Sequence, residues 1–230
     1  MDPKHVAIIL DGNRRFAKKL MLEPWKGHDY GRKKVEELLE WSKELGIKEL
    51  TFYAFSMQNF NRPKQEFDYL MGIFKSAFMD FLKEPKIDEY KVHLRVIGRY
   101  EMFPKDVVKA LEDAMARTKY YDQYYLNFAL AYGGREELTD AMKKIAQKVA
   151  DGELRPEDVD EKVVQKNLYM ESEPDLIIRT GGEKRTSNFL MWQASYSEWF
   201  FIDKTWPEFT KEDLVQIIEE FKQRDRRFGK

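Results

Sequence analysis

Short apolar runs alternate along this chain with segments whose apolar residues recur at helical spacing. Residues 6–10 (VAIIL) form a continuous apolar run that ends at Asp11-Gly12-Asn13, which is typical of a strand buried on both faces. Comparable strand-type runs cover residues 50–55, 93–97, 126–131, 175–178 and 199–202. Helical patterns cover residues 31–45, 105–118, 136–149 and 214–226, and a further helix is expected between Pro63 and Pro85. This alternation predicts an α/β fold: a single domain over residues 1–230 with a mainly parallel central sheet of about six strands flanked by helices.

Polar loops follow several of the predicted strands. Loops at the carboxyl ends of parallel strands meet at one edge of the sheet, where ligands usually bind. Residues 11–19 join an acid and a glycine to two arginines, and residues 179–188 join two glycines and hydroxyl groups to two further arginines. Both loops suit a phosphate group, and Asp11 among these cations suits a divalent metal. The alternative is that Asp11 only caps the following helix, whose basic residues face solvent.

The helix expected after Pro63 carries an apolar stripe rich in phenylalanine. Phe67, Phe74, Phe78 and Phe81 recur in it at helical spacing. The ordinary interpretation of such a stripe is a core-facing helix. If the substrates carry apolar tails, part of the stripe could instead line a tunnel.

Composition narrows the function classes further. Forty Lys and Arg residues balance forty-one Asp and Glu residues, so no overall positive field favours a nucleic-acid partner. The absence of cysteine and the three scattered histidines exclude thiolate chemistry and disfavour a zinc site, which leaves a hard cation on carboxylates. The GxxxxGK[ST] and GxGxxG patterns are absent, and Asn13 stands where a haloacid-dehalogenase-like phosphatase needs a second aspartate. With no apolar run long enough to span a membrane, we expect a cytoplasmic protein.

Several motifs in order along the chain resemble those of the cis-prenyltransferases, the undecaprenyl and dehydrodolichyl diphosphate synthases. They are HVAIILDGNRRFAKK (5–19), GH (27–28), YAFS (53–56), NFNRP (59–63), YGGR (132–135), DLIIRTGGE (175–183), SNFL (187–190), WQ (192–193), WP (206–207) and RFG (227–229). The pair Arg14-Arg15 is more similar to the archaeal and eukaryotic branch than to bacterial members. The resemblance implies a fold with a hydrophobic tunnel and repeated cis addition of isopentenyl diphosphate to an allylic diphosphate starter.

The resemblance also implies a role for individual residues. Asp11 matches the acid needed for Mg²⁺-assisted ionisation of the allylic diphosphate, and Glu198 matches a second metal-associated acid. Asn59 matches a residue that helps to remove the proton; since an amide is not a strong base, we expect it to position or relay that proton. The implied substrate-binding residues are Gly12, Asn13, Arg14, Arg15, Phe16, His28, Ser56, Met57, Gln58, Phe60 and Arg62 on the allylic side, and Arg179, Arg185, Thr186 and Ser187 on the isopentenyl side.

The chain departs from the family pattern at a few positions. Pro24 stands where many members have an arginine near the allylic diphosphate, for which Arg14 is one candidate replacement, and Lys184 replaces a histidine near the metal. Met57-Gln58 and Phe60 differ from bacterial members, which leaves the starter open between farnesyl, geranylgeranyl and shorter diphosphates.

The resemblance further implies a homodimer in which Arg227 reaches the partner's site. It implies that the product is a long polyprenyl diphosphate, the precursor of a glycosyl-carrier lipid, which is delivered to a membrane. The enzyme itself is expected to have no membrane-spanning segment and to be cytoplasmic, either free or peripheral to that membrane. A non-catalytic partner subunit is the alternative; such subunits lack acids and arginines of the diphosphate sites that are present here.

Overall fold

Every strand among residues 2–224 belongs to one parallel sheet. The computed structural model describes residues 2–224. The strands are β1 (His5–Ile9), β2 (Glu49–Ser56), β3 (Val92–Ile97), β4 (Tyr124–Tyr132), β5 (Leu176–Arg179) and β6 (Glu198–Phe201). Their order is β3-β4-β2-β1-β5-β6, and all neighbours run parallel. The predicted α/β fold with about six parallel strands is therefore confirmed.

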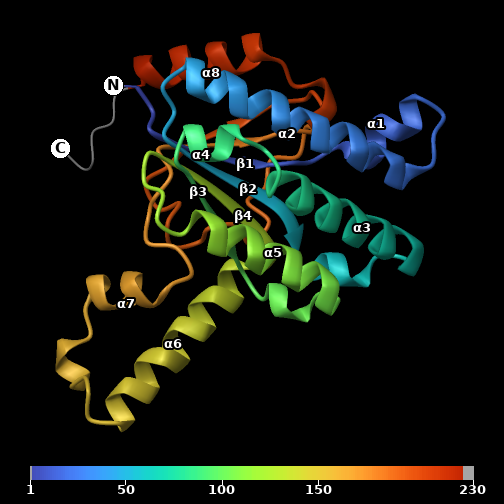
Figure 1. Ribbon diagram of the computed structural model, residues 1–230. Coiled ribbons are helices and arrows are strands. Elements are labelled where there is room, and N and C mark those ends of the chain that lie inside the picture. The colour runs from blue at the N-terminus through green and yellow to red at the C-terminus, as the bar shows by residue number, and fades with distance from the viewer. Residues whose placement is uncertain (1, 225–230) are drawn as a thin grey trace.

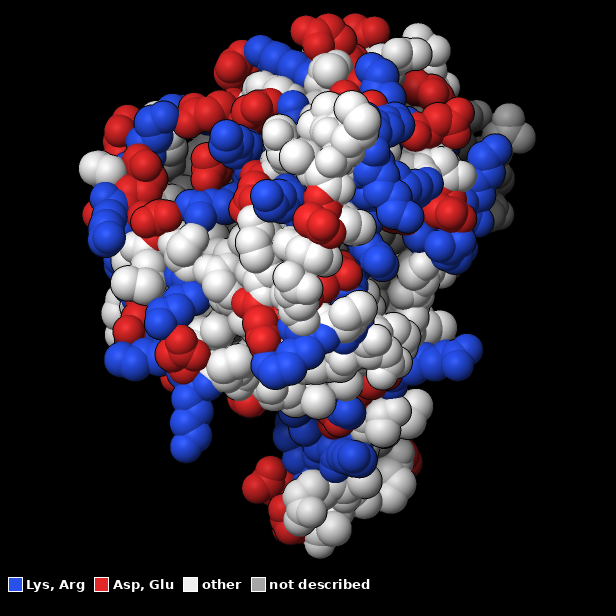
Figure 2. All heavy atoms as spheres, turned by 90° about the vertical axis from the view of Figure 1, so that its right-hand side faces the viewer, with Lys and Arg blue, Asp and Glu red and all other residues white. Residues whose placement is uncertain are grey.

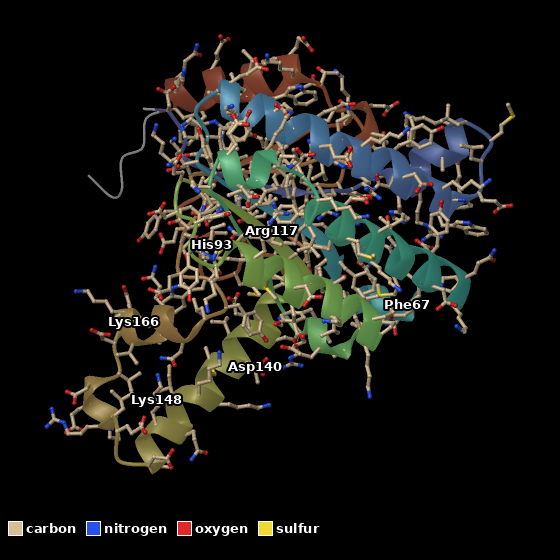
Figure 3. The ribbon with its side chains drawn as sticks, viewed as in Figure 1. Phe67, His93, Arg117, Asp140, Lys148 and Lys166 are labelled. Carbon is tan, nitrogen blue, oxygen red and sulfur yellow. The ribbon has the colours of Figure 1, made fainter. Side chains whose placement is uncertain are left out.

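The helices connect these strands. They are α1 (Asn13–Lys19), α2 (Gly27–Glu44), α3 (Lys64–Phe81), α4 (Lys86–Glu89), α5 (Lys105–Thr118), α6 (Gly134–Ala150), α7 (Glu161–Asn167) and α8 (Lys211–Gln223). Figure 1 shows α2 and α8 side by side above the sheet, α3 and α5 in front of it, and α6 with α7 extending below. Figure 3 places Phe67 on α3 and Asp140 on α6, far apart in the molecule.

Apolar side chains pack on both faces of the sheet. On one face they pack against α2, α3, α5 and α8, with Phe52, Leu111, Trp206 and Leu214 fully buried. On the other face Tyr132 and Ile177 pack against the chain segments around Met170 and Phe189. Burial on both faces explains why β1 reads as an uninterrupted apolar run.

The sequence patterns located the long elements to within a few residues, gave no bounds for the helix expected after Asp11, and missed α4 and α7. The helix expected at residues 105–118 has these bounds in the structure. α1, α4 and α7 have seven residues or fewer, so they are too short to show a 3.6-residue period. Among residues 2–224, no helix combines the length and apolarity needed to cross a membrane.

Candidate active site

Asp11 and Arg179 come together because β1 and β5 are neighbours. Ile9 pairs with Arg179 in the parallel register, and Asp11 follows two residues after Ile9. Thr180 then fixes the loop after β1, since its Oγ1 donates to the Asp11 carbonyl at 2.7 Å and accepts from the Asp11 amide at 3.1 Å. The two candidate phosphate loops therefore form one site at the carboxyl edge of the sheet.

Both carboxylate oxygens of Asp11 are held by arginines. Arg179 Nη2 donates to Oδ2 at 2.9 Å, and Arg15 Nη2 donates to Oδ1 at 3.2 Å. Arg179 is almost fully buried, whereas the Asp11 side chain is 29% exposed and faces the cleft. Asp11 does not cap α1: Gly12 is the N-cap and no side chain caps this helix. The capping alternative is therefore excluded.

The loop after β5 is shaped around these arginines. Arg179 Nη1 donates to Ser187 Oγ at 2.7 Å and to the Arg185 carbonyl, while Arg15 Nη1 donates to the Gly181 carbonyl. Gly181 has a φ of +88°, and a Cβ atom there would lie 2.5 Å from Arg15 Nη2. A side chain at this position would therefore displace the arginine that holds Asp11.

Glu66 is the centre of a second charged cluster beside the cleft. This buried carboxylate accepts from Arg62 Nη1 at 2.8 Å, and Arg14 Nε lies 3.6 Å from its other oxygen. His28 Nε2 lies 3.3 Å from Glu66 Oε1 and 3.3 Å from Arg62 Nη1. Arg14 thus stands with the predicted allylic-site residues, which supports it as the replacement for the arginine lost at Pro24.

The protonation states in this cluster follow from its contacts. The hydrogen bond from His28 and the charges of Arg62 and Arg14 lower the pKa of Glu66, against the opposing effect of burial. Burial lowers the pKa of His28 despite its contact with Glu66. At neutral pH the cluster therefore holds an ionised Glu66 beside a neutral His28.

The segment after β2 presents part of its side chains to the cleft. Asn59 Oδ1 accepts from the Ser56 amide at 2.8 Å in a capping box that begins the 3₁₀ helix Met57–Asn61. Ser56, Gln58 and Asn59 line the cleft. Phe60 instead packs edge-on against Phe55, with ring centroids 5.1 Å apart, and Met57 packs on the same core.

An apolar cavity shares wall residues with the charged cleft. The cleft, of about 480 Å³, contains Asp11, Asn59, Arg62, Arg179 and Ser187, and it shares Leu10, Ala54 and Arg62 with a cavity of about 280 Å³. The register between β2 and β4 shifts beside Ala54, so a bulge lies where the two spaces meet.

The apolar cavity runs between the sheet and the helices α2 and α3. Its walls include Val35 and Leu39 from α2, Phe128 from β4, and Leu70, Phe74, Ala77, Phe78 and Phe81 from α3. Leu39, Ile87 and Leu126 also line a further cavity of about 190 Å³. The aromatic stripe thus divides: Phe67 packs with Phe55 and Phe60, whereas Phe74 and Phe78 face both core and cavity.

Not every predicted site residue lies at the cleft. Glu198 begins β6 in register with Leu176 and hence with Val6, so it lies at the amino end of the strands and pairs with Arg224 at 2.7 Å. Asp11 and Glu198 of one chain therefore do not share a metal. Arg185 pairs with Glu183 and is 61% exposed, Thr186 is also exposed, and Arg227 lies outside the described residues.

A family model described as "Putative undecaprenyl diphosphate synthase" matches residues 9–229 of this chain. The chain belongs to the cis-prenyltransferase family. The tritrans,polycis-undecaprenyl-diphosphate synthase (geranylgeranyl-diphosphate specific) of Pyrococcus abyssi is 53% identical over 230 residues, which cover 99% of this chain and 87% of the relative. The synthase of the same name from Methanocaldococcus jannaschii is 49% identical over 232 residues, covering 99% and 83%.

Solved structures agree with this assignment. Lavandulyl diphosphate synthase from Lavandula x intermedia, in complex with dimethylallyl diphosphate, superimposes with a TM-score of 0.95 at 36% identity and covers 100% of this chain and 99% of its own. A probable undecaprenyl diphosphate synthase from Campylobacter jejuni gives a TM-score of 0.82 at 32% identity, with 100% of both chains covered. The protein is thus a cis-prenyltransferase, a transferase of isoprenoid synthesis, and the non-catalytic alternative finds no support.

This cis-prenyltransferase also has cleft residues that the sequence analysis missed. Tyr53 lines the cleft, stacks on Phe189 at 4.6 Å and has its pKa raised by burial. Asn188 ties the loop after β5 to α6, because the Gly134 amide donates to its carbonyl at 2.7 Å and the Arg135 amide to its Oδ1 at 2.9 Å. The sequence analysis also gave no role to Glu66, which lies on α3 and pairs with Arg62, two residues before the helix begins.

Proposed function

We propose that this enzyme adds isopentenyl diphosphate units in cis to geranylgeranyl diphosphate and releases a long polyprenyl diphosphate of the undecaprenyl class. The observation that carries the proposal is the junction at Leu10, Ala54 and Arg62 between a cleft rich in arginine and an apolar cavity. A prenyl diphosphate has the same two parts, a charged head and an apolar tail. The specificity in the names of the Pyrococcus and Methanocaldococcus relatives supports geranylgeranyl diphosphate as the starter.

The two charged clusters suit two diphosphate groups. Arg14, Arg62 and His28 stand beside the cavity entrance, where the allylic diphosphate would lie with its tail between α2 and α3. Arg179 and Ser187 stand across Asp11 from them and would hold isopentenyl diphosphate, with Arg185 and Thr186 at the rim. The first amides of α1, from Asn13 to Arg15, have no partners within the helix and can donate to phosphate oxygens.

We propose Asp11 as the ligand of a magnesium ion that arrives with a diphosphate. Its carboxylate is a hard oxygen donor at the cleft, which fits Mg²⁺. Magnesium would supply positive charge where the leaving diphosphate becomes more negative. Residues 2–224 hold no group of three or more His, Cys, Asp or Glu side chains that could bind a metal without substrate oxygens. Arg15 and Arg179 already occupy both oxygens of Asp11, so we expect the metal and the diphosphates, which attract these arginines, to bind together.

Fixed donors would carry the ionisation of the allylic substrate. The carbon–oxygen bond breaks as the new carbon–carbon bond forms, and negative charge grows on the leaving diphosphate. Arg62 and Arg14 are oriented beforehand by Glu66, so little reorganisation is needed at that moment. Asn59, held by its bond to the Ser56 amide, would position the proton that leaves and pass it to a diphosphate oxygen.

Two parts of the proposal concern the assembly. We propose a homodimer, as the RFG motif of the family implies, with Arg227 completing the partner's isopentenyl site. Strand register places Glu198 at the amino end of the strands and Asp11 beyond their carboxyl end. If Glu198 binds a metal, that metal would therefore lie at a site separate from Asp11 of the same chain.

The direct test is an assay of the purified protein with Mg²⁺, radiolabelled isopentenyl diphosphate and dimethylallyl, geranyl, farnesyl or geranylgeranyl diphosphate in turn. We expect fastest incorporation with geranylgeranyl diphosphate and chromatographic products of undecaprenyl length. No incorporation with any starter would contradict the function, and faster incorporation with farnesyl diphosphate would contradict the starter.

Product length should respond to the wall of the cavity. Phe78→Ala enlarges the space between α3 and Phe128, and Ala77→Trp fills it. Because a growing apolar chain must stay out of water, at about 25 cal/mol per Å², we expect longer products from the first variant and shorter ones from the second. The first condensation should change little. Mass spectrometry of the products and melting temperatures would be compared.

Phe209→Ala is the matched control, because Phe209 is fully buried against Trp41 and Trp206 and does not line the cavity. We expect it to lose about 3–5 kcal/mol of stability without a change in product length. Unchanged product lengths in folded Phe78→Ala and Ala77→Trp proteins would assign these residues to the core alone.

A further inference from the structure

The far end of α1 exposes apolar side chains that the reaction does not use. We call residues 18–26, which follow the body of this helix, the α1 tip. Met21 is 94% exposed and Leu20 44% exposed, the former being the highest value among the exposed large apolar residues. Trp25, four residues after Met21 in the chain, is half-buried. Exposed apolar side chains that gather with an aromatic residue mark an interaction surface more often than single ones do.

The α1 tip is a built feature of the fold. The amides of Leu20, Met21 and Leu22 donate to the carbonyls of Ala17 or Lys18 at 2.9 to 3.1 Å. Met21 has a φ of +55°, a backbone conformation that residues other than glycine, asparagine and aspartate seldom adopt. The backbone therefore holds Met21 outward at a conformational cost.

Two exposed lysines, Lys18 and Lys26, flank these apolar side chains in the chain. The other cations of residues 14–26 pair with acids elsewhere: Arg14 with Glu66, Arg15 with Asp11 and Lys19 with Glu208. Figure 2 faces the side of the molecule on which α1 lies and shows uncharged surface there, with Lys and Arg as well as Asp and Glu around it. Apolar side chains flanked by cations suit the boundary between anionic lipid headgroups and acyl chains.

We propose that the α1 tip docks on an anionic membrane surface, with Leu20 and Met21 inserted among the lipids and Lys18 and Lys26 on the headgroups. The proposal rests on the proposed function, because prenyl diphosphates with long apolar tails reside in membranes. The opposite end of α1 adjoins Asp11 and the cleft, and a helix of seven residues spans about 10 Å. Docking at the α1 tip therefore holds the diphosphate cleft close to the membrane surface from which a starter would come.

The test measures lipid binding without any turnover. Wild-type protein is sedimented with vesicles of phosphatidylcholine containing about one third phosphatidylglycerol, and with pure phosphatidylcholine vesicles. We expect clear binding to the anionic vesicles, at least about ten-fold weaker binding to the neutral ones, and weakening by salt. Vesicles with brominated acyl chains should quench the fluorescence of Trp25. The contribution of Trp25 is the part of the quenching that is lost in the variant Trp25→Phe.

The substitution Leu20→Gln/Met21→Asn removes the apolar contact, with asparagine chosen because it tolerates positive φ. We expect at least about ten-fold weaker vesicle binding with the circular dichroism spectrum and the rate in detergent unchanged. Met142→Gln is the matched control: Met142 is 65% exposed on α6 next to Lys143 and Lys144, without other exposed apolar neighbours in sequence, and should bind as wild type.

Two results would overturn the docking proposal. One is equal vesicle binding by the wild type and the α1-tip variant. The other is an absence of vesicle binding together with no quenching of Trp25, which would indicate that the α1 tip binds a protein partner instead of lipid. Neither outcome depends on activity, so a failure of the proposed function appears separately in the incorporation assay.

Discussion

Asp11→Asn and Asp11→Ala should each reduce turnover at least about a thousand-fold, which corresponds to about 4 kcal/mol of activation free energy. Asp11 is the acidic side chain in the cleft lining and stands between Arg15 and Arg179. Its loss would remove the proposed magnesium ligand. It would also remove the carboxylate to which Arg15 and Arg179 both donate. EDTA should abolish turnover of the wild type, and Mg²⁺ should restore it. Rates at saturating substrates and Mg²⁺ would be measured beside circular dichroism spectra.

Asp140→Asn is the matched control for Asp11. Asp140 accepts two hydrogen bonds from Arg99 at 2.8 and 2.9 Å and is 23% exposed, close to the 29% of Asp11. It lies on α6 (Figure 3) and does not line the cleft. We expect a near-normal rate from this variant. A folded Asp11→Asn protein with a rate near that of wild type would remove Asp11 from the chemistry.

Glu66→Gln should affect both stability and the allylic substrate. Glu66 is 2% exposed and faces Arg62, Arg14 and His28, so neutralising it leaves the half-buried guanidinium of Arg62 without its counter-charge. We expect a loss of about 3 kcal/mol in the free energy of unfolding. We also expect the KM for the allylic diphosphate to rise about ten-fold or more, because Arg62 loses the partner that orients it.

The pH dependence of stability offers a second signature of Glu66. Its pKa is lowered in the folded protein, so its contribution is fully present above the unfolded value of 4.5 and is lost as the pH falls through the folded value. Glu66→Gln should therefore lose less stability than wild type as the pH falls below 4.5. This would be measured by urea unfolding at several pH values.

Asp68→Asn controls for a charge change on the same helix. Its partner Lys64 is 86% exposed and Asp68 itself 55% exposed, so we expect a change within about 0.5 kcal/mol and an unchanged KM. If Glu66→Gln matched this control in both stability and KM, the charged cluster would have no positioning role.

Local patterns were sufficient for most of the fold. β1 was found because burial on both faces demands an uninterrupted apolar run, and α5 because one buried face demands a 3.6-residue period. The series of motifs between His5 and Gly229 likewise resembled the cis-prenyltransferases before any geometry was known, and the family match confirms that resemblance.

Long-range arrangement required the tertiary structure. Glu66 looks like an ordinary helix residue until the fold places Arg14 of α1, His28 of α2 and Arg62, which precedes α3, around it. Glu198 looks like a second ligand for the metal of Asp11, but register places the two at opposite ends of the strands.

The apolar stripe shows the same limit at the level of single side chains. Phe67 and Phe78 share one helical period, yet Phe67 packs against Phe55 and Phe60 while Phe78 borders a cavity. Periodicity reports only that a side chain avoids water. Whether it meets another side chain or an empty space depends on the spacing between α2, α3 and the sheet, and that spacing is set by contacts between residues far apart in the chain.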